Sequence, residues 1–336
     1  MARRDVASFV TLAGIWGSSF LLIRLGDDDL PPFAVAEIRL ALGALAAWCL
    51  ARALGVGGIG GALRRPIVAL TGLCASGVPF VLFAYGETRV ASGIAGIGNA
   101  TTPLFAAVIA QAVPLRLGGE RMTRQRAIGL AIGFGGVVAL VGDSAFGKLD
   151  AIGLACCVAA PVLYGVGGVL ARSAYRDDDP IVAAVAGNAL AALCLLPFAA
   201  IFGVPDHRPG AGSLAAVAVL GVVGTGIAFV LFYRLLASIG SVTFTLTFLV
   251  PAFAVAEGAI FLGETIRPAS ILALAAILAG VAVATGLLPW RTRRRRTSSE
   301  SASRTASEGA AAAIPAASPA PPPLAEACVA PVTRAD

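Results

Sequence analysis

Apolar residues run along this chain in long blocks that short polar stretches separate. Ten blocks are near or above the roughly 18 residues that cross a bilayer as a helix. They predict spans at about residues 6–24, 33–53, 66–86, 91–115, 126–142, 150–171, 181–202, 213–236, 241–262 and 268–288. The predicted fold class is therefore an all-α membrane protein with ten transmembrane helices.

The second five blocks repeat the first five at an offset of 148 or 149 residues. The word Phe-Val-Leu-Phe stands at 80–83 and again at 229–232. The same offset matches Trp16 with Tyr164, Arg24 with Arg172, Ser76 with Thr225, and Pro103 with Pro251. Because five is an odd number, the second copy enters the bilayer from the opposite side. The sequence therefore predicts two inverted five-helix repeats, at 6–142 and 150–288.

Composition supports the membrane interpretation and excludes several chemistries. Charged residues are 13% of the chain, against roughly 25% in a soluble domain, and 58% of residues are hydrophobic. The single lysine, Lys148, and the single histidine, His207, both fall in predicted loops. A lysine Schiff base, a histidine metal cluster or a Ser-His-Asp triad within the bilayer therefore has no residue to use. We expect no cofactor and no metal.

Basic residues indicate which side of the membrane the loops occupy, because Lys and Arg collect in cytoplasmic loops. With the N-terminus inside, the outer loops hold five basic residues, namely Arg24, Arg89, Lys148, Arg208 and Arg267. The inner loops hold twelve, namely Arg3, Arg4, Arg52, Arg64, Arg65, Arg116, Arg121, Arg124, Arg126, Arg172, Arg176 and Arg234. We therefore expect a multi-pass plasma-membrane protein with both termini cytoplasmic. Residues 291–336, rich in Ser, Ala and Pro after four arginines, predict a disordered cytoplasmic tail.

Several segments resemble a known family of carriers. GIWGSSFLLIR at 14–24, PPFAVAEIRLALGAL at 31–45 and TPLFAAVIA at 102–110 are similar to the first half of EamA-type carriers. GERMTRQRAIG at 119–129 also resembles that half, and FLVPAFAVAEGAIFLGETI at 248–266 resembles the second. These carriers belong to the drug/metabolite transporter superfamily. The resemblance implies ten helices, cytoplasmic termini and movement of small metabolites, often export of amino acids or related compounds.

Arg39 is the candidate cation of a substrate site. A charge at the middle of a membrane helix costs about 2.5–3.5 kcal/mol on insertion scales, so it requires a partner, water or a route to the interface. Arg39 stands seven residues after Pro32, hence about 10 Å along the helix. The alternative is a structural pairing with backbone carbonyls or a side chain that reaches the interface. Trp16, Phe20 and Tyr164 are the candidate aromatic contacts.

Small polar residues and prolines single out the predicted fourth and ninth spans. Asn99, Thr102 and Pro103 share one face of a helix, and Pro251 is the repeat counterpart of Pro103. Prolines within spans free carbonyl groups and permit a kink where the backbone lines a cavity. We expect Asn99 and Thr102 to contact substrate and Pro103 and Pro251 to act as hinges. The alternative is helix–helix hydrogen bonding through small polar groups.

Glu257 is the only acidic residue deep within the second half. An unpaired carboxylate at that depth is suited to load and release a proton or to receive a substrate amine. The alternative is a side chain that reaches the outer interface or bonds to a neighbouring helix. Glu257 is therefore the candidate for proton coupling.

These observations favour a secondary transporter that moves a small metabolite across the lipid bilayer by alternating access, in the direction of export. A weakly charged aromatic cavity suits a neutral or zwitterionic, amino-acid-like compound. One alternative is a membrane channel, which predicts a continuous ring of polar groups that the sequence lacks. A membrane-embedded enzyme is a further alternative, but no catalytic constellation is present, and we expect no enzymatic activity. Nothing in the chain predicts binding of nucleic acid.

Overall fold

The computed structural model describes residues 3–112, 122–145, 150–239 and 249–287, and all regular structure in these ranges is helical. The first half contains α1 (Arg3–Asp27), α2 (Pro32–Ala53), a short α3 (Ile59–Ala62), α4 (Pro66–Gly72) and α5 (Val78–Glu87). It continues with α6 (Ser92–Asn99), α7 (Thr102–Ala112) and α8 (Arg124–Ala145). The expected tail at 291–336 lies outside the described residues.

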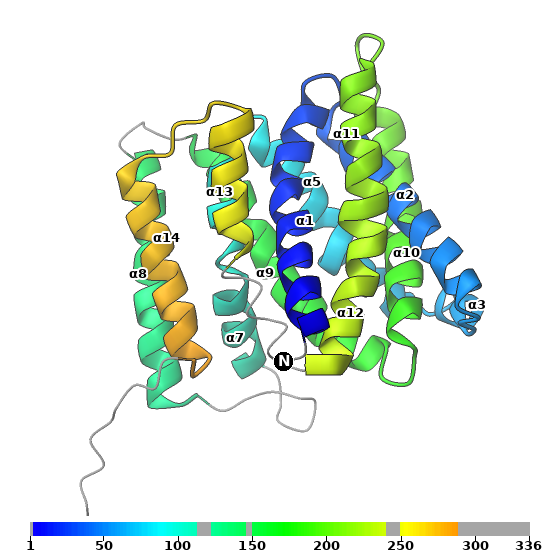
Figure 1. The fold of residues 1–336 in the computed structure, drawn as a ribbon, viewed down its shortest axis with the longest axis horizontal. Helices are drawn as coiled ribbons and strands as arrows, with labels where there is room; N and C mark the ends of the chain where they lie inside the picture. Colours follow the sequence, from blue (N-terminus) through cyan, green and yellow to red (C-terminus); the bar gives the residue numbers. More distant parts are fainter. Residues whose placement is uncertain (1–2, 113–121, 146–149, 240–248, 288–336) are drawn as a thin grey trace, which may run out of the picture. The chain divides into compact units, whose positions relative to one another are not determined.

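The second half contains α9 (Ala151–Ala174), α10 (Pro180–Phe202), α11 (Ala211–Gly221), α12 (Ala228–Ile239), α13 (Val250–Phe261) and α14 (Pro268–Ala284). Two π-helical segments complete the order: η1 (Leu73–Gly77) joins α4 to α5, and η3 (Val222–Ile227) joins α11 to α12. Figure 1 shows the helices running roughly side by side, with α8 against α14 and α1 near the middle.

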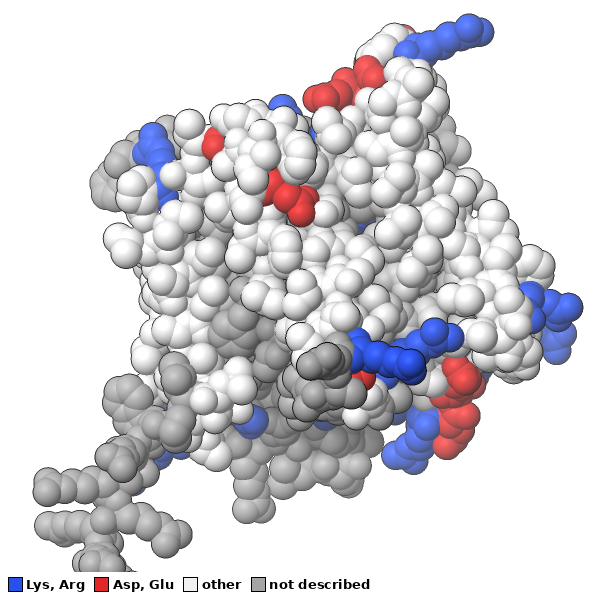
Figure 2. Space-filling view, viewed as in Figure 1, with Lys and Arg blue, Asp and Glu red and all other residues white. Residues whose placement is uncertain are grey.

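Within the part of the chain that the structure describes, seven helical stretches are long and apolar enough to cross a membrane. They are Arg4–Asp27, Pro32–Ala53, Pro66–Glu87, Ser92–Ala112, Ala151–Ala174, Pro180–Phe202 and Ala211–Phe232. The predicted fifth and tenth spans overlap α8 and α14, and α13 covers the second part of the predicted ninth span, whose residues 241–248 lie outside the described residues. Of these helices, α13 and α14 are apolar but shorter. The protein is therefore a multi-pass helical membrane protein, and the full count of ten spans stays a prediction. On the face in Figure 2, charged atoms lie mostly toward two opposite ends, with a mostly white surface between them.

Proline and aspartate mark where the helices begin. Pro32, Pro66, Pro180 and Pro268 each occupy the first position of a helix, where the missing N–H costs nothing. Asp150 caps α9 by accepting a hydrogen bond from the Gly153 amide at 2.7 Å. Asp179 likewise caps α10 through the Ile181 amide at 2.8 Å. These two carboxylates therefore define where α9 and α10 begin.

Glycines set the closest helix contacts. A Cβ atom on Gly280 of α14 would lie 2.3 Å from the Gly133 nitrogen of α8. One on Gly129 would lie 2.3 Å from the Ala284 nitrogen. Without a hydrophobic driving force between helices in lipid, such close backbone approach is a main source of association. The pairing of α8 with α14 thus depends on these small residues.

Candidate transport site

Arg39 is buried within α2, with 6% of its surface exposed. Its Nε donates a hydrogen bond to the Thr225 hydroxyl at 2.9 Å, and its guanidinium carbon lies 3.6 Å from the centre of the Phe80 ring. A desolvated cation over an aromatic face gains about 2 kcal/mol. Within the described residues no carboxylate forms an ion pair with Arg39. Arg39 is therefore a buried positive charge that forms no direct ion pair within the described part of the chain.

Two close helix approaches place Thr225 against α2. A Cβ atom on Gly43 would lie 2.7 Å from the Thr225 methyl group, and one on Gly221 would lie 3.1 Å from the Arg39 carbonyl oxygen. Only hydrogen fits at these two positions without displacement of a neighbour. The glycines therefore determine how close the Arg39 guanidinium comes to the second half of the chain.

The two π-helical segments occupy matching places in the halves. η1 precedes the first Phe-Val-Leu-Phe word and η3 precedes the second. A π-bulge adds a residue to the turn and is frequent at functional sites. The Thr225 hydroxyl, besides accepting from Arg39, donates to the Leu220 carbonyl five residues earlier at 3.2 Å. The bulge in η3 thus turns this hydroxyl toward α2.

Phenylalanines of the two Phe-Val-Leu-Phe words contact the predicted aromatic residues. Phe83 lies edge-on to Phe20 at 5.5 Å between ring centres and packs against Tyr164 at 6.1 Å. In the second word, Phe229 and Phe232 contact Trp16, with ring centres 6.2 and 5.3 Å away. Trp16 and Tyr164 are repeat counterparts, and each meets the word of the opposite half. The recurrence of the word therefore has a structural reason.

Asn188 stands where the second half would place a counterpart of Arg39, 149 residues later. It is 2% exposed, and its amide nitrogen has no hydrogen-bond partner. Asn188 lines a cavity of about 40 Å³ together with Ser76, the counterpart of Thr225, and Phe229, the counterpart of Phe80. In the first half this position holds the buried Arg39, and in the second half it holds the shorter Asn188, beside which a small cavity lies.

Asn99 and Thr102 lie at a break between α6 and α7. The Thr102 hydroxyl donates to the Asn99 carbonyl at 2.7 Å, and Thr101 beside it is fully buried. Pro103 occupies the second residue of α7, and Pro251 the second residue of α13. No hydrogen bond or ring contact of the described part joins Asn99 or Thr102 to Trp16 or Tyr164. The structure thus places Arg39, Phe20 and Tyr164 against the first word and Trp16 against the second. It leaves the polar pair on its own helix break.

Glu257 of α13 is half-buried and reaches α1. One carboxyl oxygen accepts a hydrogen bond from the Ser18 hydroxyl at 2.9 Å, while the other is buried without a partner. Ser18 also bonds to the Gly14 carbonyl, also at 2.9 Å, so α1 holds its hydroxyl in place. The contact between neighbouring helices that the sequence left open as an alternative is therefore present.

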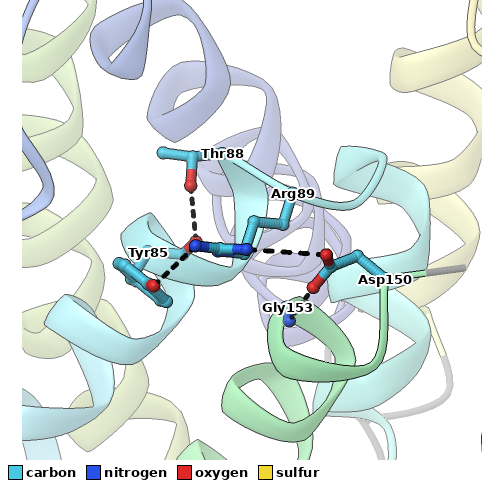
Figure 3. A network of polar contacts seen from close by, with 5 residues as sticks. All are labelled: Tyr85, Thr88, Arg89, Asp150 and Gly153. Carbon is cyan, nitrogen blue, oxygen red and sulfur yellow. Dashed lines mark hydrogen bonds and ion pairs between the residues drawn. The ribbon is translucent and has the colours of Figure 1, made fainter.

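A polar network connects the end of α5 to the start of α9 (Figure 3). Arg89 donates to the Tyr85 hydroxyl at 2.8 Å and lies 3.5 Å from the Asp150 carboxylate. The hydrogen bond from the Gly153 amide, followed by the nearby Arg89 charge, lowers the pKa of Asp150. The bond to Tyr85 raises the pKa of Arg89. Tyr85 therefore holds an arginine at the end of α5.

Sequence reasoning missed Thr225 and Glu87. Thr225 was noted only as the counterpart of Ser76, because nothing local in the sequence tells which helix its hydroxyl faces. Glu87 follows directly after the predicted span 66–86, at a position where the hydropathy pattern predicts a loop, yet it is 0% exposed. A glutamate at the edge of an apolar span, with Arg24 predicted at the same end, was the available signal. In the described residues, no group of three or more His, Cys, Asp or Glu is placed to hold a metal ion.

The family of the chain follows from comparison with known proteins. The model of the EamA-like transporter family matches residues 6–142 and 151–286. The chain belongs to this family, as the resemblance of its segments predicted. Residues 6–142 and 151–286 are matched separately, one after the other.

Similar proteins are named as transporters. A probable terminal-alkyne amino-acid exporter of Streptantibioticus cattleyicolor is 32% identical over 89% of this chain and 97% of its own length. A probable amino-acid metabolite efflux pump of Salmonella typhimurium is 24% identical over 88% of this chain and 98% of its own. A crystal structure described only as that of a protein aligns with a TM-score of 0.59 at 23% identity, over 86% of this chain and 100% of that one. The last likeness concerns the fold alone.

Proposed function

We propose that this protein is a secondary carrier that exports a small neutral or zwitterionic, amino-acid-like compound by alternating access between two inverted repeats. The observation that carries the proposal is Arg39, a buried cation of the first half that bonds to Thr225 of the second. A substrate carboxylate is the natural partner for a guanidinium that no carboxylate of the described residues pairs directly. The names of the two full-length relatives support both the compound class and the direction.

The aromatic residues around Arg39 suit the rest of such a substrate. Trp16, Phe20 and Tyr164 provide apolar surface with few polar groups, which is the usual lining of a small-molecule site. Glu257 is available in a neighbouring pair of helices for a substrate amine or a proton. Sugar phosphates or nucleotide sugars would need more fixed positive charge than Arg39 alone supplies.

Alternating access follows from the repeat. Two inverted halves exchange roles and so produce two states of similar energy around one site. Trp16 contacts the second word and Tyr164 contacts the first, so both contacts cross between the halves. As the halves move, we expect each of these contacts either to be kept or to be replaced. We further propose that the N- and C-termini are cytoplasmic, as the distribution of arginine predicts.

Efflux from proteoliposomes tests the proposal. Vesicles that contain the purified protein are loaded with a panel of radiolabelled amino acids, sugar phosphates and nucleosides, with and without a pH gradient. We expect protein-dependent efflux of one or more amino acids and no efflux with Arg39→Gln. Efflux confined to sugar phosphates or nucleosides, or amino-acid efflux that Arg39→Gln leaves unchanged, would contradict it.

A further inference from the structure

A second pocket lies at the end of the bundle where α1 and α5 end and α6 begins. It has a volume of about 440 Å³ and is lined by charged residues from three segments, including Arg24, Asp28, Glu87 and Glu264. Under the proposed orientation this is the outer end of the protein. Neither Arg39 nor its partners Thr225 and Phe80 line this pocket.

Glu87 is the unusual residue of this pocket. The residue contributes to the lining, but its side chain is 0% exposed and neither carboxyl oxygen has a hydrogen-bond partner. Arg24 is close by, yet it donates to the Glu87 backbone carbonyl at 2.9 Å and not to the carboxyl group. Asp27 of α1 is in the same condition, because both of its carboxyl oxygens are buried without partners.

Glu264 shows how a carboxylate of this pocket is stabilised when it is ionised. It accepts hydrogen bonds from the Ser92 amide at 2.7 Å, the Ser92 hydroxyl at 3.0 Å and the Gly93 amide at 3.0 Å. These donors form the N-terminus of α6, where the helix dipole also favours negative charge. Glu264 therefore has what an ionised carboxylate requires, and Glu87 has none of it.

The charges around Glu87 add to this difference. The titratable and charged groups that face it from the packed elements are Arg24 and Asp27 of α1, Arg39 of α2, Cys157 of α9 and Glu264 after α13. On its own side, Arg89 is engaged with Tyr85 and Asp150. An ionised Glu87 would be a buried charge without a donor, next to two other carboxylates, which is strongly unfavourable. A neutral Glu87 removes this cost.

We propose that Glu87, with Asp27 beside it, holds an exchangeable proton, and that this pocket is where the transporter takes up that proton from the side opposite its N-terminus. In the present arrangement the carboxyl group is neutral and shut off from water. When α1 and α13 separate at this end, water reaches Glu87, the proton leaves to solvent and the carboxylate remains beside Arg24. Proton uptake then permits the end to close again. This inference rests on the proposed carrier function.

Infrared spectroscopy of the purified protein tests the proposal without any substrate. We expect a band from protonated carboxyl groups at neutral pH, and we expect Glu87→Gln to remove part of it. Glu264→Gln is the matched control, since it removes a carboxyl group of the same pocket that three hydrogen-bond donors contact, and we expect it to leave that band unchanged. Absence of the band in the wild-type protein would overturn the proposal whether or not the variants fold.

Accessibility of the pocket provides a second test. Val90→Cys, at a buried position that lines the pocket, is labelled in proteoliposomes with a membrane-impermeant maleimide over a range of pH, in a background without native thiols. Thr88→Cys, at an exposed position of the same pocket, is labelled in parallel as the reference for how pH changes the reactivity of the thiol itself. We expect labelling of Val90→Cys relative to Thr88→Cys to rise with pH because ionised Glu87 keeps this end open, and this ratio to stay low and independent of pH when Glu87→Gln is added. Equal pH dependence in both proteins would contradict the proposal. Neither test requires transport, so failure of the amino-acid panel is distinguishable from failure here.

Discussion

The Arg39 guanidinium has two partners of different chemistry, a hydroxyl from the second half of the chain and an aromatic ring from the first. Lysine keeps the charge but lacks the planar group that stacks on Phe80 while it bonds to Thr225. The role of this residue therefore rests on shape as well as on charge.

Arg39→Lys is expected to lower the apparent affinity for the exported compound at least tenfold. Lysine cannot form the bidentate pair with a substrate carboxylate, a hydrogen bond between charged groups contributes about 1.5–3 kcal/mol, and each 1.4 kcal/mol is a factor of ten in affinity. KM for efflux from proteoliposomes measures the change, and Arg234→Lys, at an exposed arginine of α12, is the matched control. An unchanged KM for Arg39→Lys would show that the charge alone suffices.

Glu257→Gln is expected to change the rate and to weaken the pH dependence of transport. The substitution keeps size and polarity while it removes a group with one bonded and one buried, unpartnered oxygen. Efflux is compared between pH values in the wild type, in Glu257→Gln and in Ser18→Ala, which removes the hydrogen bond but keeps the carboxyl group. If Glu257→Gln is normally expressed and transports with unchanged rate and pH dependence, the coupling role is wrong.

At the scale of elements, the contact between α2 and η3 depends on glycine. Gly43→Ala is expected to destabilise the protein by about 1–3 kcal/mol, the usual cost of overpacking a close contact. The added Cβ atom would lie 2.7 Å from the Thr225 methyl group. Gly168→Ala in α9 is the control, because nothing lies within 4 Å of its Cβ position. Thermal unfolding in detergent measures both, and equal stability of the two variants would contradict the packing argument.

The loop after α1 supports the start of α11 through Asp29. Its carboxylate lies 3.0 Å from the His207 Nε2 and accepts hydrogen bonds from the Gly210 amide at 2.9 Å and the Ser213 hydroxyl at 2.8 Å. These bonds, with that to His207 the largest contribution, lower the pKa of Asp29 to about 2. A carboxyl group with a depressed pKa stabilises the folded state above its unfolded pKa, near 4, and loses this effect as the pH falls.

Asp29→Asn is therefore expected to be less stable than the wild type above about pH 4. The difference should fade as the pH drops toward about 2, the pKa of the folded state. Thermal unfolding of both proteins across this range measures the effect. Asp206→Asn, an exposed aspartate in the same loop as His207, should show no such difference, and a gap between wild type and Asp29→Asn that persists at the lowest pH would contradict the account.

The sequence predicted most of the helices and the importance of Arg39, because hydropathy and a lone buried charge are local properties. It did not predict the partner of Arg39, since Thr225 lies 186 residues away and the contact depends on the glycine approach between α2 and η3. The π-helical segments also escaped prediction, because apolar periodicity does not distinguish them from α-helix. Glu87 shows the same limit at a helix end, where burial depends on which neighbouring helices cover it.

At the scale of the whole molecule, the inverted repeat requires a defined topology. Single cysteines at positions 124 and 300, in a background without native thiols, should react only with reagents that reach the cytoplasm. A cysteine at position 208, in the loop between α10 and α11, should react from outside. Labelling of position 124 or 300 from outside would overturn both the orientation and the inverted repeat.

The central claim is that one site is exposed alternately to the two sides of the membrane, and counterflow tests it most directly. Proteoliposomes are loaded with an unlabelled amino acid that the efflux panel identifies, and a trace of the labelled compound is added outside. A carrier exchanges the two, so the account predicts a transient accumulation of label inside above its outside concentration, absent with Arg39→Gln. Entry of label that never exceeds the outside concentration, whatever the internal load, would indicate a channel and contradict the account.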